Sequence, residues 1–399
     1  MLKLIYLLLV FISVILVLLV KRPLYQAVLC GLLICCLLFQ IPVSRIFQII
    51  IDTSVSWSCI SVVFSLYLIT LLQHILDRKK QISLAQKDLD ELFHNRRINA
   101  TIAPIFIGLL PHAGAMILCS DIVKEATDDY LKPEEQAFVT NWFRHIPEST
   151  LPTYTGVLLM TSLSGVPLSR FIPCMIVPIF LLFLIGYLPY LRKIPAKETA
   201  CGNPSFRSFL HLLKHLWSLL LVLFLILVFR LSVVSSLLLV IILCFFVYRF
   251  SFCEFLQVAK ESFVLRLLAN SFLVLLLKEF ITYTSVLSLL PDLLEKLPIP
   301  SYLLFALLFF FATIISGTTA AIALGAPLAF ASGNGDLALA VLLMGMCHGA
   351  SQLSPIHVCL SVASDCFHIP LFSLIRKSLP SVLLFALAML AYYHILLLF

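Results

Sequence analysis

Two proline-containing segments carry most of the side chains that can bind a small polar molecule. Residues 145–154 read HIPESTLPTY, and residues 348–357 read HGASQLSPIH. Hydroxyls beside unwound backbone can bind an ion or a polar ligand, and a basic side chain beside them can balance an anion. Arg144 and Glu148 also have the i, i+4 spacing of a structural ion pair, which is the alternative for these two residues. The candidate substrate-binding residues of the two segments are Arg144, His145, Glu148, Ser149, Thr150, His348, Ser351, Gln352, Ser354 and His357.

Two further segments, 101–120 and 304–332, combine apolar side chains with helix-breaking residues. The first contains two prolines and two glycines, and the second contains Gly317, Gly325 and Pro327. Such residues interrupt a helix, and interrupted backbone at membrane depth must be buried in protein or line a water-filled cavity. We expect both segments to be hairpins that enter and leave on the same side of a membrane. Their tips add His112, Gly114, Ser316, Gly317, Thr318 and Thr319 to the candidate substrate-binding residues.

The composition indicates which solvent these segments face. Of the 399 residues, 61% are hydrophobic and 12% are charged, and the mean hydropathy is +1.09. An ordinary soluble domain has about 45–50% apolar and about 25% charged residues. This excludes a cytosolic enzyme, a nucleic-acid-binding module and a disordered regulator, and it indicates a multi-pass membrane protein. None of the 12 cysteines forms a CxxC pair, so we expect neither disulfides nor a metal site.

Apolar runs of the length that a bilayer demands give ten candidate crossings. They are 2–20, 24–41, 54–76, 142–164 and 171–190 in the first half, and 214–230, 232–248, 264–288, 337–362 and 379–398 in the second. Lysine and arginine are enriched in cytoplasmic loops, so the side with the more basic loops lies inside the cell. This rule places the N-terminus outside, the basic linker 191–213 inside and the C-terminus outside, in a cell inner membrane.

The two halves of the chain resemble each other in sequence. A single offset aligns His145 with His348 and Pro152 with Pro355, and the same offset aligns the two hairpin tips. The loop charges alternate in opposite senses in the two halves, and an inverted repeat with paired broken segments is typical of a secondary transporter. We therefore expect an all-α polytopic membrane protein with about ten transmembrane helices plus two re-entrant helical hairpins. The expected domains are a first inverted repeat (1–190, with hairpin 101–120 and interrupted helix 142–164), a cytoplasmic linker (191–213) and a second inverted repeat (214–399, with hairpin 304–332 and interrupted helix 337–362).

Three stretches of the sequence also carry a family resemblance: GLLPHAGAMILCSDIV, NWFRHIPESTLPTYTG and HGASQLSPIHVCL. They resemble a prokaryotic integral membrane protein family of unassigned function in the Ion Transporter superfamily, which includes gluconate permeases, citrate carriers and dicarboxylate–sodium symporters. The resemblance implies a scaffold domain and a transport domain of two hairpins and two interrupted helices. The Ser-Asn-Thr sequence of the dicarboxylate symporters is absent from both hairpin tips, so their substrate and sodium specificity are not carried over.

The leading functional hypothesis is a secondary active transporter, a permease that moves a small organic anion of the carboxylate class by alternating access. Transport would be coupled to H⁺ or Na⁺, as in symport. His112, His145, His348 and His357 lie in the four broken segments, and histidine titrates close to physiological pH. This favours proton coupling over sodium coupling.

The alternative is a membrane-embedded enzyme in which His348, His357 and Asp365 form an intramembrane acid/base or metal cluster. The sequence contains no HExxH, GxSxG or P-loop motif. We therefore expect no enzyme, no catalytic residues and no cofactor other than the coupling ion, H⁺ or Na⁺. The expected partners are the small organic anion and the lipid bilayer, without nucleic acid, and a homodimer is left open.

Overall fold

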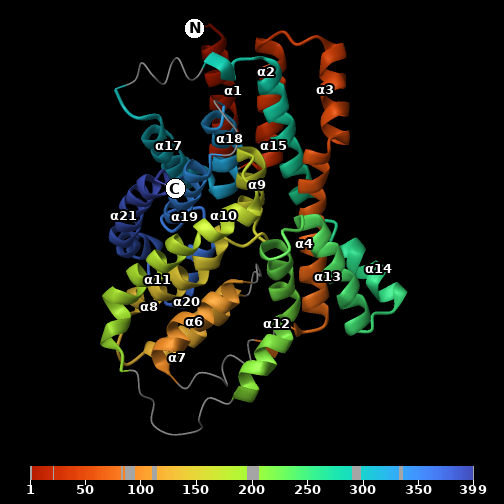
Figure 1. Cartoon of the computed structure of the whole chain (residues 1–399). Helices are drawn as coiled ribbons and strands as arrows, with labels where there is room; N and C mark the ends of the chain where they lie inside the picture. Colours follow the sequence, from red (N-terminus) through yellow and green to blue (C-terminus); the bar gives the residue numbers. More distant parts are fainter. Residues whose placement is uncertain are drawn as a thin grey trace.

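The computed structural model describes residues 2–20, 22–81, 84–85, 95–109, 115–195, 206–289, 298–331 and 336–398. Within these residues every regular element is a helix (Figure 1). The all-α class predicted from the sequence is therefore confirmed for the described part of the chain.

The helices of the first half begin with four that follow one another closely and end with a series of shorter ones. They are α1 (Leu2–Leu19), α2 (Leu24–Leu38), α3 (Val43–Val55), α4 (Trp57–Arg78), α6 (Arg96–Gly108), α7 (Ala115–Thr127), α8 (Pro133–His145), α9 (Thr155–Ser164), α10 (Leu168–Cys174) and α11 (Ile176–Tyr190), with the 3-10 helices η1 (Ile146–Ser149) and η2 (Leu191–Lys193).

The helices of the second half follow a similar order. They are α12 (Phe206–Leu227), α13 (Val233–Val247), α14 (Phe252–Glu261), α15 (Leu265–Tyr283), α17 (Ser301–Ser316), α18 (Thr318–Ala329), α19 (Leu337–Ser351), α20 (Val358–Cys366) and α21 (Leu371–Leu396), with η3 (Leu287–Leu289).

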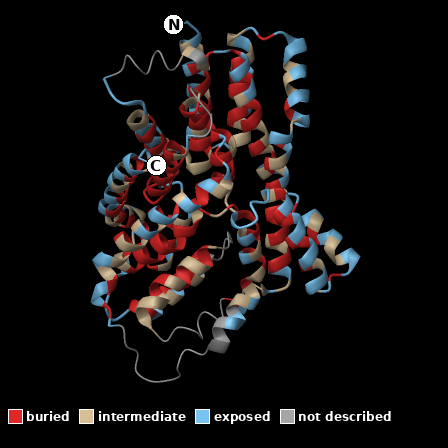
Figure 2. Ribbon diagram, in the orientation of Figure 1, coloured by how far each residue is buried: buried red, intermediate tan, exposed pale blue. Residues whose placement is uncertain are grey.

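Helices from the two halves pack against one another. α2 packs against α15, α4 packs against α13 and α15, and α18 packs against α9. In Figure 1, α1, α2 and α15 stand side by side at the top, and α4, α12 and α13 lie below them. α6, α7, α11, α20 and α21 pack against α8, and α9, α10, α17, α18 and α21 pack against α19. Every residue over 136–145 in α8 and 338–351 in α19 is buried (Figure 2). A helix that is buried all round lies in a core. α8, α19 and the helices packed against them are therefore called the buried layer, with α8 and α19 at its centre.

By length and composition, four helical stretches of the described chain are long and apolar enough to cross a membrane. They are Leu2–Leu19, Trp57–Arg78, Leu168–Lys193 and Leu371–Leu396. Shorter apolar helices, α2, α13 and α17 among them, accompany these four. The outer surface is also apolar: α3 exposes Val43, Phe47, Ile51 and Val55, which share one face of the helix. These features support a multi-pass membrane protein.

Several boundaries differ from the sequence prediction. The first interrupted segment was expected at 142–164, but its leading helix α8 already begins at Pro133, where Glu135 accepts a hydrogen bond from the backbone N–H of Lys132 and caps the helix. The charged first turn of α8 hides this start from a search for apolar runs. In the same way α21 begins at Leu371, eight residues before the expected span, because Arg376 and Lys377 interrupt its apolar pattern.

Candidate functional site

Two helices stop within the buried layer. α8 ends at His145, η1 follows, and α9 begins only at Thr155. In the second half, α19 ends at Ser351 and α20 begins at Val358. Each interruption contains proline, which lacks a backbone N–H and clashes with the preceding turn of a helix, so neither helix continues through it.

A cavity of about 180 Å³ lies between the first break, α18 and α19. The first turns of α9 and α18 meet beside it, since a Cβ added to Gly156 would lie 3.4 Å from Cγ2 of Thr318. The wall therefore combines segments far apart in the sequence. The lining residues are Glu148, Ser149, Tyr154, Thr155, Gly156, Thr318, Thr319, Met344, His348 and Ser351.

The cavity is bordered by the N-terminal turns of α9 and α18. The residues before these helices, Tyr154 and Gly317, provide no side-chain cap. The first N–H groups of a helix have no partner inside it, and they carry the positive end of the helix dipole. Gly317 has φ +83°, a conformation that glycine adopts easily and that reverses the chain between α17 and α18. The cavity wall thus presents backbone donors suited to an anion.

Six of the residues chosen from the sequence line this cavity: Glu148, Ser149, Thr318, Thr319, His348 and Ser351. Sequence reasoning missed Tyr154, Thr155, Gly156 and Met344. A signal for the first three existed, because they lie two to four residues after the second proline of the first break. Nothing in the sequence distinguishes Met344 from its apolar neighbours in α19.

The other described candidates do not line the cavity, and several of them hold the broken segments together. Gln352 accepts a hydrogen bond of 2.6 Å from the side-chain amide of Asn141, which joins the second break to α8. The hydroxyl of Ser354 donates to the carbonyl oxygen of Ile314 at 2.8 Å, and that of Ser316 donates within its own helix. The described candidates outside the cavity wall are Arg144, His145, Thr150, Ser316, Gly317, Gln352, Ser354 and His357, while His112 and Gly114 lie outside the described residues.

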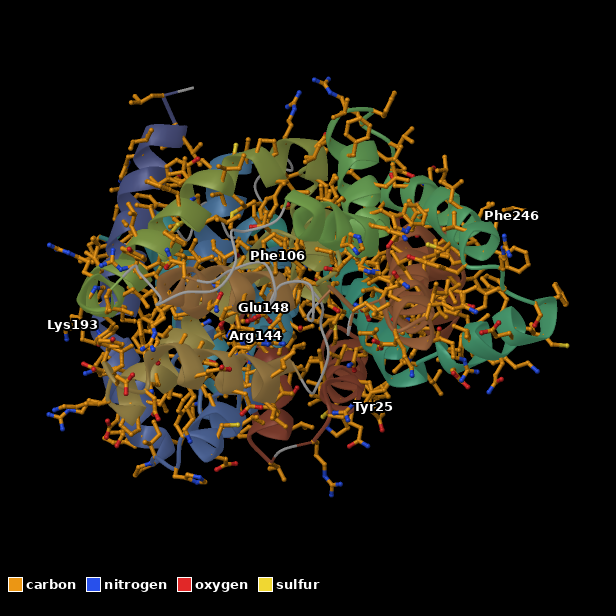
Figure 3. The ribbon with its side chains drawn as sticks, turned by 90° about the horizontal axis from the view of Figure 1, so that it is seen from below. Tyr25, Phe106, Arg144, Glu148, Lys193 and Phe246 are labelled. Carbon is orange, nitrogen blue, oxygen red and sulfur yellow. The ribbon has the colours of Figure 1, made fainter. Side chains whose placement is uncertain are left out.

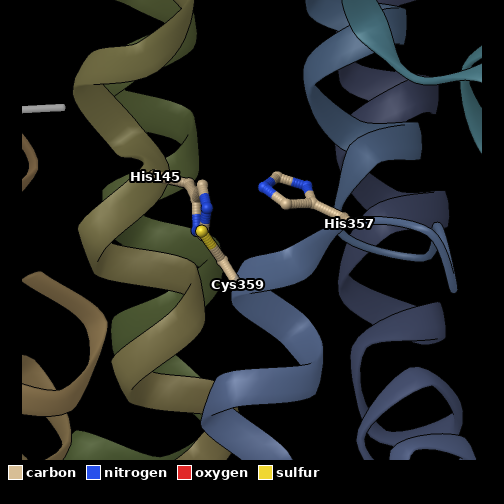
Figure 4. Close-up of side chains that lie close together, drawn as sticks. All are labelled: His145, His357 and Cys359. Carbon is tan, nitrogen blue, oxygen red and sulfur yellow. The ribbon is translucent and has the colours of Figure 1, made fainter. Parts of the chain in front are cut away.

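A separate cluster of ionisable groups lies beside the cavity, between α8 and the start of α20. The rings of His145 and His357 meet edge to face with centroids 4.8 Å apart, and the thiol of Cys359 lies next to them (Figure 4). The guanidinium of Arg144 is buried in the same cluster, with Nη1 3.2 Å from Nε2 of His145 and 3.5 Å from the sulfur of Cys359. Arg144 therefore points toward this cluster and does not line the cavity.

The cluster has some features of a metal site. Nδ1 of His145 and Nδ1 of His357 contact backbone carbonyl oxygens at 2.5 and 3.2 Å, and a carbonyl can only accept, so both nitrogens donate. Both Nε2 lone pairs then stay available, and one ring nitrogen of each histidine and the Cys359 sulfur lie within 4.8 Å of one another. A cation there would have to displace the Arg144 guanidinium, which already donates to two of the three atoms and repels positive charge. Asp365, the third member of the enzyme alternative, is exposed near the end of α20.

Three consecutive residues at the first break have buried oxygen atoms without a hydrogen-bond partner in the described part of the chain. These atoms are Oε2 of Glu148, Oγ of Ser149 and Oγ1 of Thr150. Ser149 is 1% exposed and lines the cavity. Leaving such an atom unpaired costs about 1–3 kcal/mol, and native proteins seldom tolerate it. A bound molecule in the cavity can supply the missing partners to Glu148 and Ser149.

A second hollow, a groove of about 270 Å³, runs along the later turns of α9. It lies between α9, α4 and the start of α13, and its wall contains an unusual number of hydroxyls. Thr155, Leu158 and Ser162 share one face of α9, so the helix face that borders the cavity also borders the groove. The hydroxyl-bearing lining residues are Ser58, Ser61, Ser65, Thr161, Ser162 and Ser232.

An ion-pair network fixes the other end of α8, outside the apolar part of the helix. The carboxylate of Glu135 lies 3.4 Å from the ammonium of Lys377 and 3.7 Å from that of Lys193, so it links α8 to α21 and η2. Partial burial alone would raise the pKa of Glu135, but the backbone N–H of Lys132 and the two ammonium groups outweigh it and lower the pKa below its ordinary value. The network helps to hold α8 in place.

This network gives a pH-dependent contribution to stability. The pKa of Glu135 is lower in the folded protein than in the unfolded chain, so the contribution is complete above about pH 5 and is lost as the pH falls through the folded-state pKa. We expect Glu135→Gln to lower the free energy of unfolding by about 1 kcal/mol at pH 7 and by less in acid. Thermal unfolding between pH 7 and pH 4 measures this, with Glu134→Gln as the control; identical pH profiles for wild type and Glu135→Gln would contradict it.

Comparison with known proteins gives a family and a fold. Residues 4–395 match a family described as "Protein of unknown function (DUF401)". None of the curated proteins matches the chain. Among solved structures, the Alcanivorax borkumensis YdaH transporter, whose crystal structure "reveals an unusual topology", matches with a TM-score of 0.60 and 15% sequence identity over 87% of each chain. At this identity the likeness shows the fold alone, which is therefore transporter-like.

Proposed function

We propose that this chain, which belongs to the DUF401 family, is a secondary transporter. It moves a small organic anion, a carboxylate, by alternating access coupled to H⁺ or Na⁺. The observation that carries the proposal is the cavity between broken segments, bordered by two uncapped helix N-termini. Half-helix N-termini that point at an anionic group are a recurring element of transporter sites. The transporter-like fold supports the same conclusion.

The order of the helices supports the proposed inverted repeat of residues 1–190 and 214–399 around the linker 191–213. In each half the second helix is followed by an amphipathic helix, α3 in the first half and α14 in the second. A long helix, a helical hairpin and an interrupted helix then follow in both halves. α6–α7 and α17–α18 correspond to the two expected hairpins, and α8–α9 and α19–α20 to the two expected interrupted helices. Membership of the Ion Transporter superfamily and a place in the inner membrane, both expected from the sequence, remain parts of the proposal.

The groove along α9 is the proposed access route to the cavity. Its hydroxyl-rich wall suits a hydrated ligand, whereas a surface that faces lipid carries apolar side chains. A third hollow, lined by Leu72, Leu151 and Leu216 among others, also touches the first break; it is apolar and has a volume of only about 30 Å³. The route through the groove is therefore the wider of the two.

Cysteine labelling tests this route. In a Cys253→Ser background, which removes an exposed thiol, Ser61→Cys and Ser162→Cys are expected to react with a membrane-impermeant thiol reagent. Modification is expected to block uptake, because the attached group fills the groove. Ile60→Cys, on a different face of α4, is the control and should keep its uptake. Labelling of Ser61→Cys and Ser162→Cys without loss of uptake would exclude the groove as the route.

The coupling ion is tested by reconstitution. His348 lines the cavity, and His145 and His357 lie in the adjacent cluster, which supports the preference for protons. Proteoliposomes with an imposed proton gradient should accumulate a labelled carboxylate without any nucleotide, and His348→Ala should lose this uptake. Uptake that follows a sodium gradient and ignores pH would replace H⁺ by Na⁺ in the proposal. Absence of uptake for every carboxylate under either gradient would contradict the transporter itself.

A further inference from the structure

Glu148 is the one acidic side chain that lines the cavity in the described part of the chain, where neither lysine nor arginine joins it. Its Oε2 is buried and has no hydrogen-bond partner. The Glu148 side chain as a whole is 30% exposed. An acceptor atom that is buried without a donor is nevertheless costly, so such an atom normally meets a cation or an N–H or O–H donor. Oε2 of Glu148 is therefore an acceptor that a donor group of a ligand in the cavity can satisfy.

The basic side chains beside Glu148 do not donate a hydrogen bond to its Oε2; Figure 3 labels Arg144 and Glu148 close to each other in the middle of the molecule. Nε2 of His145 lies 3.7 Å from Oε2, which is longer than a hydrogen bond. That nitrogen faces Arg144 at 3.2 Å, and because Nδ1 of the same ring donates to a carbonyl, Nε2 acts as the acceptor. Arg144 itself is directed at His145 and Cys359, and no direct ion pair between Arg144 and Glu148 forms in the described chain. The structural pair suggested by their i, i+4 spacing is absent because the helix breaks between them.

The same cavity offers donors to a negative group. The N–H groups in the first turns of α9 and α18 border it, and Thr318 and Thr319 add hydroxyls. A purely anionic ligand would bring its charge into one small cavity with the Glu148 carboxylate, and like charges repel strongly away from bulk water. A ligand with both a negative and a positive group avoids this repulsion.

We propose that the cavity binds a small amino-carboxylate, with its carboxylate on the first turns of α9 and α18 and its protonated amine on Glu148. The hydroxyl of Ser149, which lacks a partner, and that of Ser351, which donates to the His348 carbonyl and can still accept, complete the ammonium site. The volume of about 180 Å³ is below the about 300–1,000 Å³ of sites for drug-sized ligands, so the ligand has the size of a single small amino acid. This inference rests on the proposed function. It narrows the proposed carboxylate substrate to a compound that carries a carboxylate and a protonated amine.

Matched pairs of ligands test the proposal, because an α-amino acid and the α-hydroxy acid with the same skeleton differ only in the amine. The purified full chain is titrated with alanine and lactate, serine and glycerate, and aspartate and malate, with thermal unfolding as the readout. For the pair that binds, the amino acid is expected to bind about ten- to hundredfold more tightly than the hydroxy acid. Glu148→Gln should bring this ratio close to one while the hydroxy acid still binds.

Glu135→Gln, which removes a carboxylate far from the cavity wall, is the control and should keep the wild-type ratio. Glu148→Asp, which retains the charge, should keep a preference for the amine and guards against loss of folding in Glu148→Gln. Equal binding of amino and hydroxy acids by the wild type, or an unchanged ratio in Glu148→Gln, would overturn the amine assignment and leave a carboxylate carrier intact. Failure of all six compounds to bind, together with absence of carboxylate uptake in proteoliposomes, would overturn the proposed function as well.

Discussion

Uptake by a Thr319→Trp variant is expected to fall at least about a hundredfold, to background in a proteoliposome assay. Thr319 lines the cavity on the first turn of α18, and an indole there occupies much of its 180 Å³. A ligand would have to overlap this ring, and a loss of about 2.8 kcal/mol of binding free energy already corresponds to a hundredfold loss of affinity. The ligand is therefore excluded although the helices remain in place.

Ser301→Trp is the matched control for this variant. Ser301 is also a hydroxyl residue in the first turn of a hairpin helix, but it is exposed and lies at the opposite end of α17 from the turn that leads to Thr318. Its replacement should leave uptake within about twofold of wild type, since exposed substitutions have small effects. Wild-type uptake by Thr319→Trp would show that the transported molecule does not pass through this cavity.

Gly108→Ala is expected to destabilise the protein by about 3 kcal/mol or more. A Cβ at this position would lie 2.0 Å from the backbone carbonyl oxygen of Arg144, so α6 and α8 would have to separate. The carbonyl of Gly108 also accepts the hydroxyl of Tyr154, which borders the cavity. Displacement of α6 should therefore lower both the unfolding temperature and ligand binding.

Gly156→Ala is the control for the loss of a glycine in the same layer. Its Cβ would lie 3.4–3.6 Å from its nearest neighbours, which is ordinary van der Waals contact. We expect its unfolding temperature to stay within a few degrees of wild type. Equal unfolding temperatures for Gly108→Ala and wild type would show that α6 and α8 do not approach as closely as the structure has them.

Breaks and turns were the most predictable part of the fold, because single residues determine them. The prolines in HIPESTLPTY and HGASQLSPIH lie where α8 and α19 end, and Gly317 lies between α17 and α18. Helix starts were less predictable, since a search for apolar runs ignores polar residues that are nevertheless buried. Gln136, Thr140 and Asn141 of α8 are buried polar residues of this kind.

The candidate site was predicted in part, and the errors have a common physical cause. A helical periodicity gives the direction of a side chain only while the helix continues, and the direction is lost at a break. Glu148 and Ser149 line the cavity, whereas Arg144 and His145, before the break, point into the cluster with Cys359. The i, i+4 rule failed for Arg144 and Glu148 because their segment is not one continuous helix.

The most direct test of the central claim is a thermal-unfolding screen of the wild type and of Thr319→Trp against small carboxylates, with and without an amine. A ligand that binds the native state raises its unfolding temperature by mass action. We expect a subset of carboxylates to raise the unfolding temperature of the wild type and none of them to raise that of Thr319→Trp. Equal shifts in both proteins would place the binding site elsewhere and contradict the account.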